Sequence, residues 1–130
     1  HVKSRVVHLQ HIKKGDFVSY GGQYVAEKNE LIGVLPIGYA DGYMRNFSKK
    51  STVLFKGQRI PVTGIVCMDY TMIRLPDNFS SEAEIFNEEI VLLGDQNGEN
   101  IRADELANLA NTNAYEVMTQ MSSRLQRVFS

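Results

Sequence analysis

The segment Thr-Val-Leu-Phe-Lys-Gly-Gln-Arg-Ile-Pro-Val-Thr-Gly-Ile-Val, residues 52–66, carries the clearest fold signal in the chain. Two runs rich in β-branched and apolar residues, 52–55 and 59–66, stand on either side of the turn Lys-Gly-Gln at 56–58. Short apolar runs separated by a glycine-containing turn of this length are typical of a β-hairpin. We therefore predict two strands separated by a turn here and extend the same interpretation in both directions.

Similar short runs, bounded by Gly, Asn or Asp, recur along the first two-thirds of the chain. The further predicted strands span residues 5–12, 17–20, 23–27, 31–37, 71–75 and 89–93. The predicted turns lie at 14–16, 21–22, 29–30 and 94–98, and a long polar loop is predicted at 76–84. Many short strands at such spacing point to a barrel or a sandwich.

The pattern changes to a helical period near the C-terminus. Apolar residues between 101 and 110 fit a short amphipathic helix that ends near 111–113. Asn113 with Glu116 three residues later is a capping pattern, which predicts a second helix to about residue 121. A last strand is predicted at 124–129. The predicted fold class is therefore mainly β, a barrel-like β-domain with two short helices near the C-terminus.

Composition limits the functions that this chain can have. With 130 residues and 43% hydrophobic residues, it can bury a core of its own, so residues 1–130 are expected to form one domain. The formal net charge is -1 and the basic residues are scattered, which argues against nucleic-acid binding and against a polybasic membrane contact. The apolar stretches are far shorter than the roughly 20 residues of a membrane-spanning helix.

The start of the chain and its cysteine content bear on its setting. It begins at His1 without an initiator Met, which favours a piece of a longer protein, and no secretory signal opens it. Cys67, the single cysteine, cannot form an internal disulfide and has no partner at a zinc-site spacing, so no metal site is expected. A cytoplasmic location is the simplest interpretation.

Three segments combine tyrosine, glycine and other reactive residue types: VSYGGQY at 18–24, PIGYADGYMR at 36–45 and GIVCMD at 64–69. Each alone has an ordinary structural explanation as a hairpin end, a tight turn or core filling. In this order, and followed by IRADELA at 101–107 and by further blocks at 115–117 and 123–127, they resemble the C-terminal domain of alanine racemases. The resemblance extends from residue 5 to residue 127.

The resemblance implies a pyridoxal-phosphate-dependent isomerase that interconverts L-alanine and D-alanine, a reaction of D-alanine biosynthesis for peptidoglycan precursors. In that family an N-terminal (β/α)8 barrel domain, absent from this chain, carries the lysine that holds pyridoxal 5'-phosphate. The β-domain of one subunit reaches over the barrel of its partner in a homodimer. The cofactor would therefore be bound mainly by the barrel domain, the ligand would be a small amino acid, and the isolated domain is expected to be inactive.

The resemblance also assigns roles to individual residues. Tyr20 is the catalytic base on one face of the substrate, and the backbone N–H of Met68 contacts the substrate carboxylate. Tyr39 lies at the inner constriction of the substrate channel, and Arg45 lies at its outer entrance. Tyr115 hydrogen-bonds the cofactor phosphate. An ordinary tyrosine has a pKa of about 10, so Tyr20 needs help from the barrel to act as a base near neutral pH.

These roles predict a spatial arrangement. Tyr20, Tyr39, Tyr43 and Met68 are expected to converge on one face, and such a cluster of large side chains would mark an interface in the intact enzyme.

The chain also departs from the family pattern. Ile65 stands where the family commonly has Arg, and Asn113 stands where a β-branched apolar residue is common. Both departures concern the outer channel.

Three alternatives remain open at this point. The racemase region of a membrane-bound serine/alanine racemase carries a closely similar domain, preceded by transmembrane helices. Basic-amino-acid decarboxylases of the same cofactor fold type use a Cys-Asp block, but here Met68 separates Cys67 from Asp69. A non-catalytic β-barrel binding module would fit the strand pattern alone.

Overall fold

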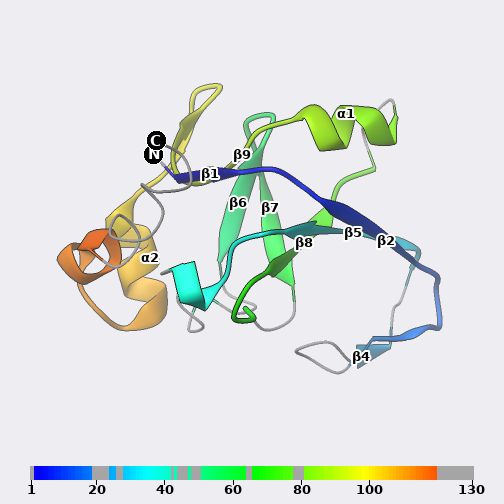
Figure 1. Ribbon diagram of the computed structural model, residues 1–130, viewed down its shortest axis with the longest axis horizontal. Coiled ribbons are helices and arrows are strands. Elements are labelled where there is room, and N and C mark those ends of the chain that lie inside the picture. The colour runs from blue at the N-terminus through cyan, green and yellow to red at the C-terminus, as the bar shows by residue number, and fades with distance from the viewer. Residues whose placement is uncertain are drawn as a thin grey trace.

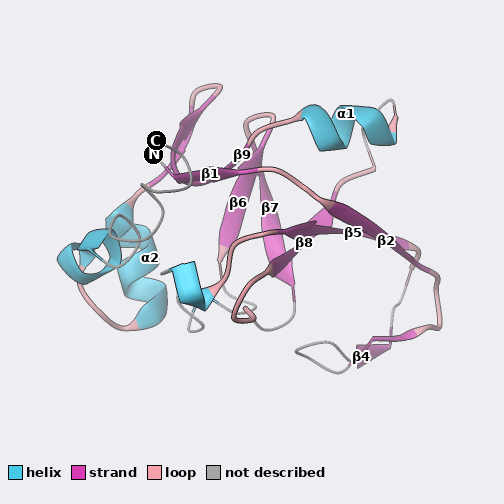
Figure 2. Cartoon of the chain, viewed as in Figure 1, coloured by secondary structure: helices cyan, strands magenta, loops and turns pink. Residues whose placement is uncertain are grey.

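A computed structural model describes residues 2–18, 24–25, 28–41, 43, 47, 51–63, 66–77 and 81–119. These residues form an eight-stranded antiparallel sheet, a separate two-stranded ribbon and short helices (Figures 1 and 2). The strands of the large sheet are β1 Val2–Ser4, β2 His8–Ile12, β5 Glu30–Leu35, β6 Thr52–Phe55, β7 Gln58–Thr63, β8 Thr71–Leu75, β9 Ile90–Gln96 and β10 Glu99–Ile101. The ribbon pairs β3 Phe17–Val18 with β4 Tyr24–Val25.

The large sheet curls back on itself. Its strand order is β1-β9-β6-β7-β8-β5-β2, with β10 paired to β9, so β1 and β2 stand at opposite ends of the order. Only residues 5–7 separate these two strands in the chain, and the Val7 N–H donates to the Val34 carbonyl of β5 at 2.9 Å. The mainly β, barrel-like prediction is therefore confirmed.

Two hairpins show how turn residues set the register. The β6–β7 hairpin turns at Lys56 and Gly57, with φ of 53° and 78°, and Leu54 pairs with Arg59. Positive φ at both turn positions is typical of a type I′ turn, whose twist matches that of the flanking strands. Asn97 and Gly98 repeat this pattern between β9 and β10. The predicted turn at 94–98 is therefore shorter than expected, because β9 continues to Gln96.

Three α-helices lie among the described residues: α1 Glu82–Asn87, α2 Ala103–Ala110 and a short helix over residues 114–119. The prediction of a loop throughout 76–84 is wrong at its C-terminal end, where α1 begins. Ser81 accepts a hydrogen bond from the Glu84 N–H, and Ile85 is fully buried. Ser81 followed by Glu84 is a capping signature that the polar composition of this segment obscured.

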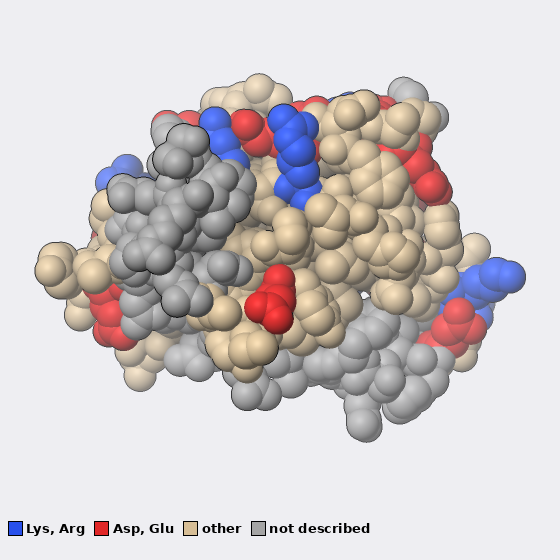
Figure 3. All heavy atoms as spheres, viewed as in Figure 1, with Lys and Arg blue, Asp and Glu red and all other residues tan. Residues whose placement is uncertain are grey.

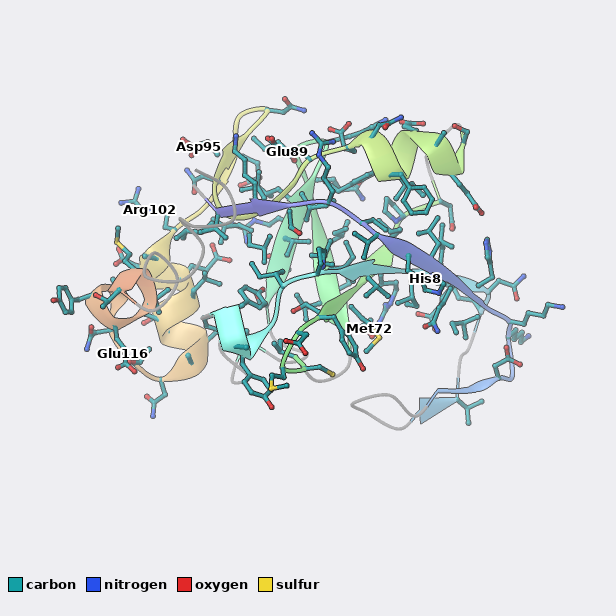
Figure 4. All side chains as sticks on the ribbon, viewed as in Figure 1. His8, Met72, Glu89, Asp95, Arg102 and Glu116 are labelled. Carbon is teal, nitrogen blue, oxygen red and sulfur yellow. The ribbon has the colours of Figure 1, made fainter. Side chains whose placement is uncertain are left out.

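The two helices predicted near the C-terminus are confirmed. Asn111 ends α2 in the left-handed conformation, and its N–H reaches the Ala107 and Asn108 carbonyls. The Asn113 side chain then accepts from the Glu116 N–H at 2.9 Å and starts the next helix. Glu116 is labelled on this helix in Figure 4. The strand predicted at 124–129 lies outside the described residues.

Arg59 attaches α2 to the sheet. Its guanidinium donates to both carboxylate oxygens of Glu105 at 2.6 and 2.9 Å, to the Asn100 carbonyl at 2.6 Å and to the Thr52 hydroxyl at 3.1 Å. A guanidinium and a carboxylate joined by two parallel hydrogen bonds form a stronger ion pair than a single contact does. The hydrogen bonds to Glu105 raise the pKa of Arg59. Sequence reasoning missed this contact because Asn100 and Glu105 lie 41 and 46 residues away.

Charge is distributed without a dominant patch on the face that Figure 3 shows. Lys and Arg side chains lie apart from one another there, beside acidic and uncharged residues. None of the described helices is long and apolar enough to cross a membrane.

Tyr43 is a core residue, so the expectation that it joins an exposed tyrosine cluster is wrong. Its exposed fraction is 0%, its ring packs edge-on against Phe47 at 4.9 Å between centroids, and its hydroxyl lies 2.8 Å from Ser51 Oγ. The expectation came from the proposed interface with another subunit, whereas the hydrophobic core takes up this side chain. Tyr43 therefore anchors the segment that follows β5.

Tyr43→Phe is expected to lower the free energy of unfolding near neutral pH by about 1 kcal/mol, because it removes the hydrogen bond to Ser51. Burial raises the pKa of Tyr43 above its ordinary value. The folded state therefore keeps this proton at a pH where the unfolded chain releases it. The resulting contribution is fully present below pH about 10 and is lost as the pH rises further. Chemical denaturation at a series of pH values from neutral to alkaline gives the free energy of unfolding. This free energy should fall more steeply with pH for the unsubstituted chain than for the variant, and an equal pH dependence of the two would contradict the prediction.

Candidate functional site

Two segments distant in sequence meet at one end of β5 and β8. The 3-10 turn η1, Tyr39–Asp41, follows β5, and the loop of residues 66–70 precedes β8. The Tyr39 N–H donates to the Cys67 carbonyl and the Ala40 N–H donates to the Met68 carbonyl, both at 3.0 Å. Figure 1 shows η1 beside the loop that enters β8. Two of the predicted site residues, Tyr39 and Met68, are thereby brought together.

Gly38 permits this close approach. A methyl group at its Cα would overlap the Cys67 carbonyl oxygen and lie 2.6 Å from the Met68 carbonyl oxygen, well inside van der Waals contact. Any side chain would therefore push the two segments apart. The glycine of the Gly-Tyr pair is required here for contact between backbones, which is a recurrent use of glycine.

The side chains of Tyr39 and Met68 are 45% and 52% exposed, and neighbouring Tyr70 is also exposed. The Tyr70 side chain is hydrogen-bonded to Cys67, which raises the pKa of Tyr70. The Cys67 N–H also donates to the Tyr70 carbonyl at 3.0 Å, so the loop is closed on itself. Large side chains at adjacent exposed positions mark a surface suited to contact with a ligand or another chain.

The backbone N–H of Met68 has no hydrogen-bond acceptor within the described part of the chain. Its neighbours on the loop are engaged: the Cys67 N–H, the Cys67 carbonyl and the Met68 carbonyl all form hydrogen bonds. A backbone donor left unused beside an exposed surface is able to bind an anionic oxygen. This is the chemistry that a carboxylate contact needs.

Tyr20 and Arg45 lie outside the described residues. The strands on either side of Tyr20 are described, because β3 ends at Val18 and β4 begins at Tyr24. The convergence of Tyr20 with Tyr39 and Met68 stays a prediction, and so does the position of Arg45 at the channel entrance. The departure at Ile65 also falls outside the described residues.

Tyr115 suits a role as a ligand contact. It is 80% exposed, and its phenol has no partner among the residues described. The helix that carries it is attached through Val117, which is fully buried, and through the Asn113 cap. A phenol held in this way can donate a hydrogen bond to a phosphate oxygen, so Tyr115 fits a single contact to the phosphate of pyridoxal phosphate. The departure at Asn113 supplies the cap of this helix.

The chain is similar in sequence to known alanine racemases. The family model described as "Alanine racemase, C-terminal domain" matches residues 1–129. The alanine racemase of Thermodesulfovibrio yellowstonii is 44% identical over 128 residues, which cover 98% of this chain and 34% of that protein. This chain thus spans about a third of the length of that relative.

Two solved structures extend the comparison. The alanine racemase from Bacillus anthracis, with bound L-Ala-P, has a TM-score of 0.81 and 36% identity, with coverage of 95% of this chain and 30% of that chain. The alanine racemase from Bartonella henselae, with covalently bound pyridoxal phosphate, has a TM-score of 0.78 over 92% of this chain and 32% of that chain; at 24% identity it shows a shared fold. Fold, ordered sequence blocks and family model agree, and the chain belongs to the family of alanine racemase C-terminal domains.

Proposed function

We propose that residues 1–130 form a single domain that supplies part of the active site of an amino-acid racemase, which interconverts L-alanine and D-alanine. The observation that carries this proposal is the Met68 N–H beside Tyr39 on an exposed surface, which has no acceptor among the described residues. A domain that completes its own site would not need such a surface. The proposed partner is the pyridoxal-phosphate barrel of the other subunit in a homodimer, and the names of the relatives support alanine as the substrate.

Each predicted residue has a distinct task in this proposal. The Met68 N–H donates a hydrogen bond to the substrate carboxylate and so orients the Cα–H bond. Tyr39 narrows the channel and excludes water, while Arg45 attracts the anionic end of the incoming amino acid. Tyr20 removes a proton from one face of Cα and returns one in the opposite direction. A second base in the barrel serves the other face.

The cofactor would be held mainly by the barrel, with Tyr115 contributing one hydrogen bond to its phosphate. When bound, pyridoxal phosphate supplies an electron sink that stabilises negative charge at Cα. The chain must then provide orientation and proton transfer. An ordinary tyrosine has a pKa of about 10, and lowering the pKa of a tyrosine by about 3 units would need roughly 4 kcal/mol of differential stabilisation. We assign that stabilisation to groups of the barrel.

Co-expression of residues 1–130 with the separate barrel domain tests this function. We expect no racemisation and no retained cofactor absorbance from residues 1–130 alone after dialysis, and racemisation of L-alanine when both domains are present. Circular dichroism of the amino acid and the visible absorbance of bound cofactor are the two measurements. The result follows because neither domain alone holds both proton-transfer groups.

The matched control is residues 1–130 with Tyr20→Phe, which should assemble with the barrel without restoring normal activity. L-Serine is assayed in parallel, because faster conversion of serine than of alanine would favour a serine racemase. Cofactor retention or racemisation by residues 1–130 alone would contradict the proposal. So would assembly with the barrel that leaves both amino acids unchanged.

A further inference from the structure

We propose that Gly38 and Thr71 are positioning residues that direct the Met68 N–H toward the substrate carboxylate. This inference rests on the proposed function and extends it to two residues that have no contact with the substrate themselves.

The first step concerns the orientation of one peptide group. The Met68 N–H and the Cys67 carbonyl belong to the same planar trans peptide, so they point in opposite directions. The Cys67 carbonyl accepts the Tyr39 N–H at 3.0 Å and therefore points at η1. The Met68 N–H must then point away from η1. The hydrogen bond from Tyr39 thus sets the direction of the proposed carboxylate donor.

The second step concerns the next peptide group. The Met68 carbonyl accepts the Ala40 N–H at 3.0 Å, so the peptide after Met68 is also held by η1. Two consecutive peptide groups fixed by two consecutive donors leave little freedom for rotation at Met68. A donor that is already oriented loses less entropy when it binds a ligand. The η1 turn therefore acts on the substrate through the main chain of the loop.

The third step explains why Gly38 is needed. Its own carbonyl accepts the Tyr43 N–H at 3.2 Å, and the preceding Ile37 carbonyl accepts the Thr71 hydroxyl at 2.6 Å. The peptide groups on both sides of Gly38 are therefore held. A methyl group at Gly38 could not avoid the Cys67 and Met68 carbonyls by a change in its own backbone angles. The loop would have to move, and the Met68 N–H would move with it.

The fourth step concerns Thr71, the first residue of β8. Its side chain is fully buried, and its hydroxyl connects the end of the 66–70 loop to the backbone just before Gly38. A buried carbonyl that loses its donor is costly, so this contact resists separation of the loop from η1. Gly38 permits the approach of the two segments, and Thr71 holds them at that distance.

The experiment separates the carboxylate contact from a general loss of structure. In the full-length enzyme, inhibition constants are measured for propionate, which has the carboxylate of alanine without its amino group. Ethylamine, which has the amino group without the carboxylate, is measured in parallel. Gly38→Ala is expected to raise the inhibition constant of propionate and the KM of both alanine enantiomers about tenfold, since a hydrogen bond to a charged group is misaligned. The inhibition constant of ethylamine should stay within about twofold.

The chain offers a matched control in Gly33 of β5. A methyl group there would meet the core side chains of Leu75 and Val6 at 3.1 Å, and it has no contact with the 66–70 loop among its nearest neighbours. Gly33→Ala should therefore leave the ratio of the two inhibition constants unchanged. In residues 1–130, amide hydrogen exchange at Tyr39 and Ala40 should accelerate in Gly38→Ala and not in Gly33→Ala.

Thr71 keeps the proposal testable if Gly38→Ala does not fold. Thr71→Val preserves the side-chain shape and removes the hydroxyl. It should raise the inhibition constant of propionate severalfold more than that of ethylamine. Thr71→Ser keeps a hydroxyl, so the ratio of the two inhibition constants should equal that of the unsubstituted enzyme. Equal weakening of both inhibitors, or an unchanged inhibition constant for propionate in Gly38→Ala and Thr71→Val, would overturn the inference while alanine racemisation persists. An unsubstituted full-length enzyme that does not racemise alanine would instead overturn the proposed function, and the inference with it.

Discussion

Tyr20→Phe in the full-length enzyme is expected to slow proton exchange on one face of alanine by at least about 100-fold, the lower range for loss of a general acid or base. The phenolic oxygen of Tyr20 is the only proton carrier proposed on that face. The other face, served by the barrel, should retain its exchange rate far better. Incorporation of solvent deuterium at Cα, measured separately from L-alanine and from D-alanine, distinguishes the two faces.

Tyr43→Phe is the matched control, because it removes the same hydroxyl from a buried tyrosine that has no role in the proposed chemistry. This variant should exchange the Cα proton of both alanine enantiomers with solvent at nearly the rate of the unsubstituted enzyme. Equal slowing on both faces in Tyr20→Phe would indicate a general disturbance of the site. Near-normal exchange on both faces would remove Tyr20 from the role of base.

The strands that sequence reasoning placed best are those whose limits are set by local turn chemistry. Strands were predicted at 52–55 and 59–66 on either side of a turn at 56–58. β6 has the predicted bounds, β7 spans Gln58–Thr63, and Lys56 and Gly57 form the turn with positive φ. β8, at Thr71–Leu75, has the predicted bounds. In both cases the signal lies within a few residues of the element, which is the range over which turn and strand preferences act.

The two strands that were missed, β1 and β10, depend on pairing with β9. β1 comprises only Val2–Ser4 and forms because β9, about 90 residues later, pairs with it. β10 likewise completes a hairpin whose first strand was predicted to end earlier. Such short strands carry too little periodicity of their own to be recognised, and their pairing supplies the stabilisation.

Part of the candidate site was also predictable from the sequence, and part depends on contacts between distant segments. The residue types of Tyr39 and Met68 pointed to chemistry through the family resemblance, and their proximity is now visible in the hydrogen bonds between η1 and the 66–70 loop. The role of Gly38 could not be read from its neighbours, because its constraint comes from Cys67 and Met68, about 30 residues away. The burial of Tyr43 was missed for the same reason, because it depends on packing in the core and not on the tyrosine-rich segment around it.

An ester in place of the amide between Cys67 and Met68 is expected to raise the KM for alanine by about 10- to 100-fold in both directions. The 2-hydroxy acid analogue of methionine at position 68, introduced by semisynthesis, removes the N–H and keeps the side chain. A hydrogen bond between a neutral donor and a carboxylate contributes about 1.5–3 kcal/mol, which corresponds to this range. Met68→Leu retains the N–H, so it should change KM by no more than a few-fold.

The ester has one side effect that a second ester can measure. It weakens the Cys67 carbonyl as an acceptor for the Tyr39 N–H, and an ester at Asp69 weakens the Met68 carbonyl as an acceptor for the Ala40 N–H in the same way. Only the first ester removes the proposed donor to the substrate. If the KM rises about 10- to 100-fold with the ester at Met68 and much less with the ester at Asp69, the donor itself binds the carboxylate. Equal effects of the two esters would assign the loss to the contact between η1 and the loop, and would leave the Met68 N–H without a direct role.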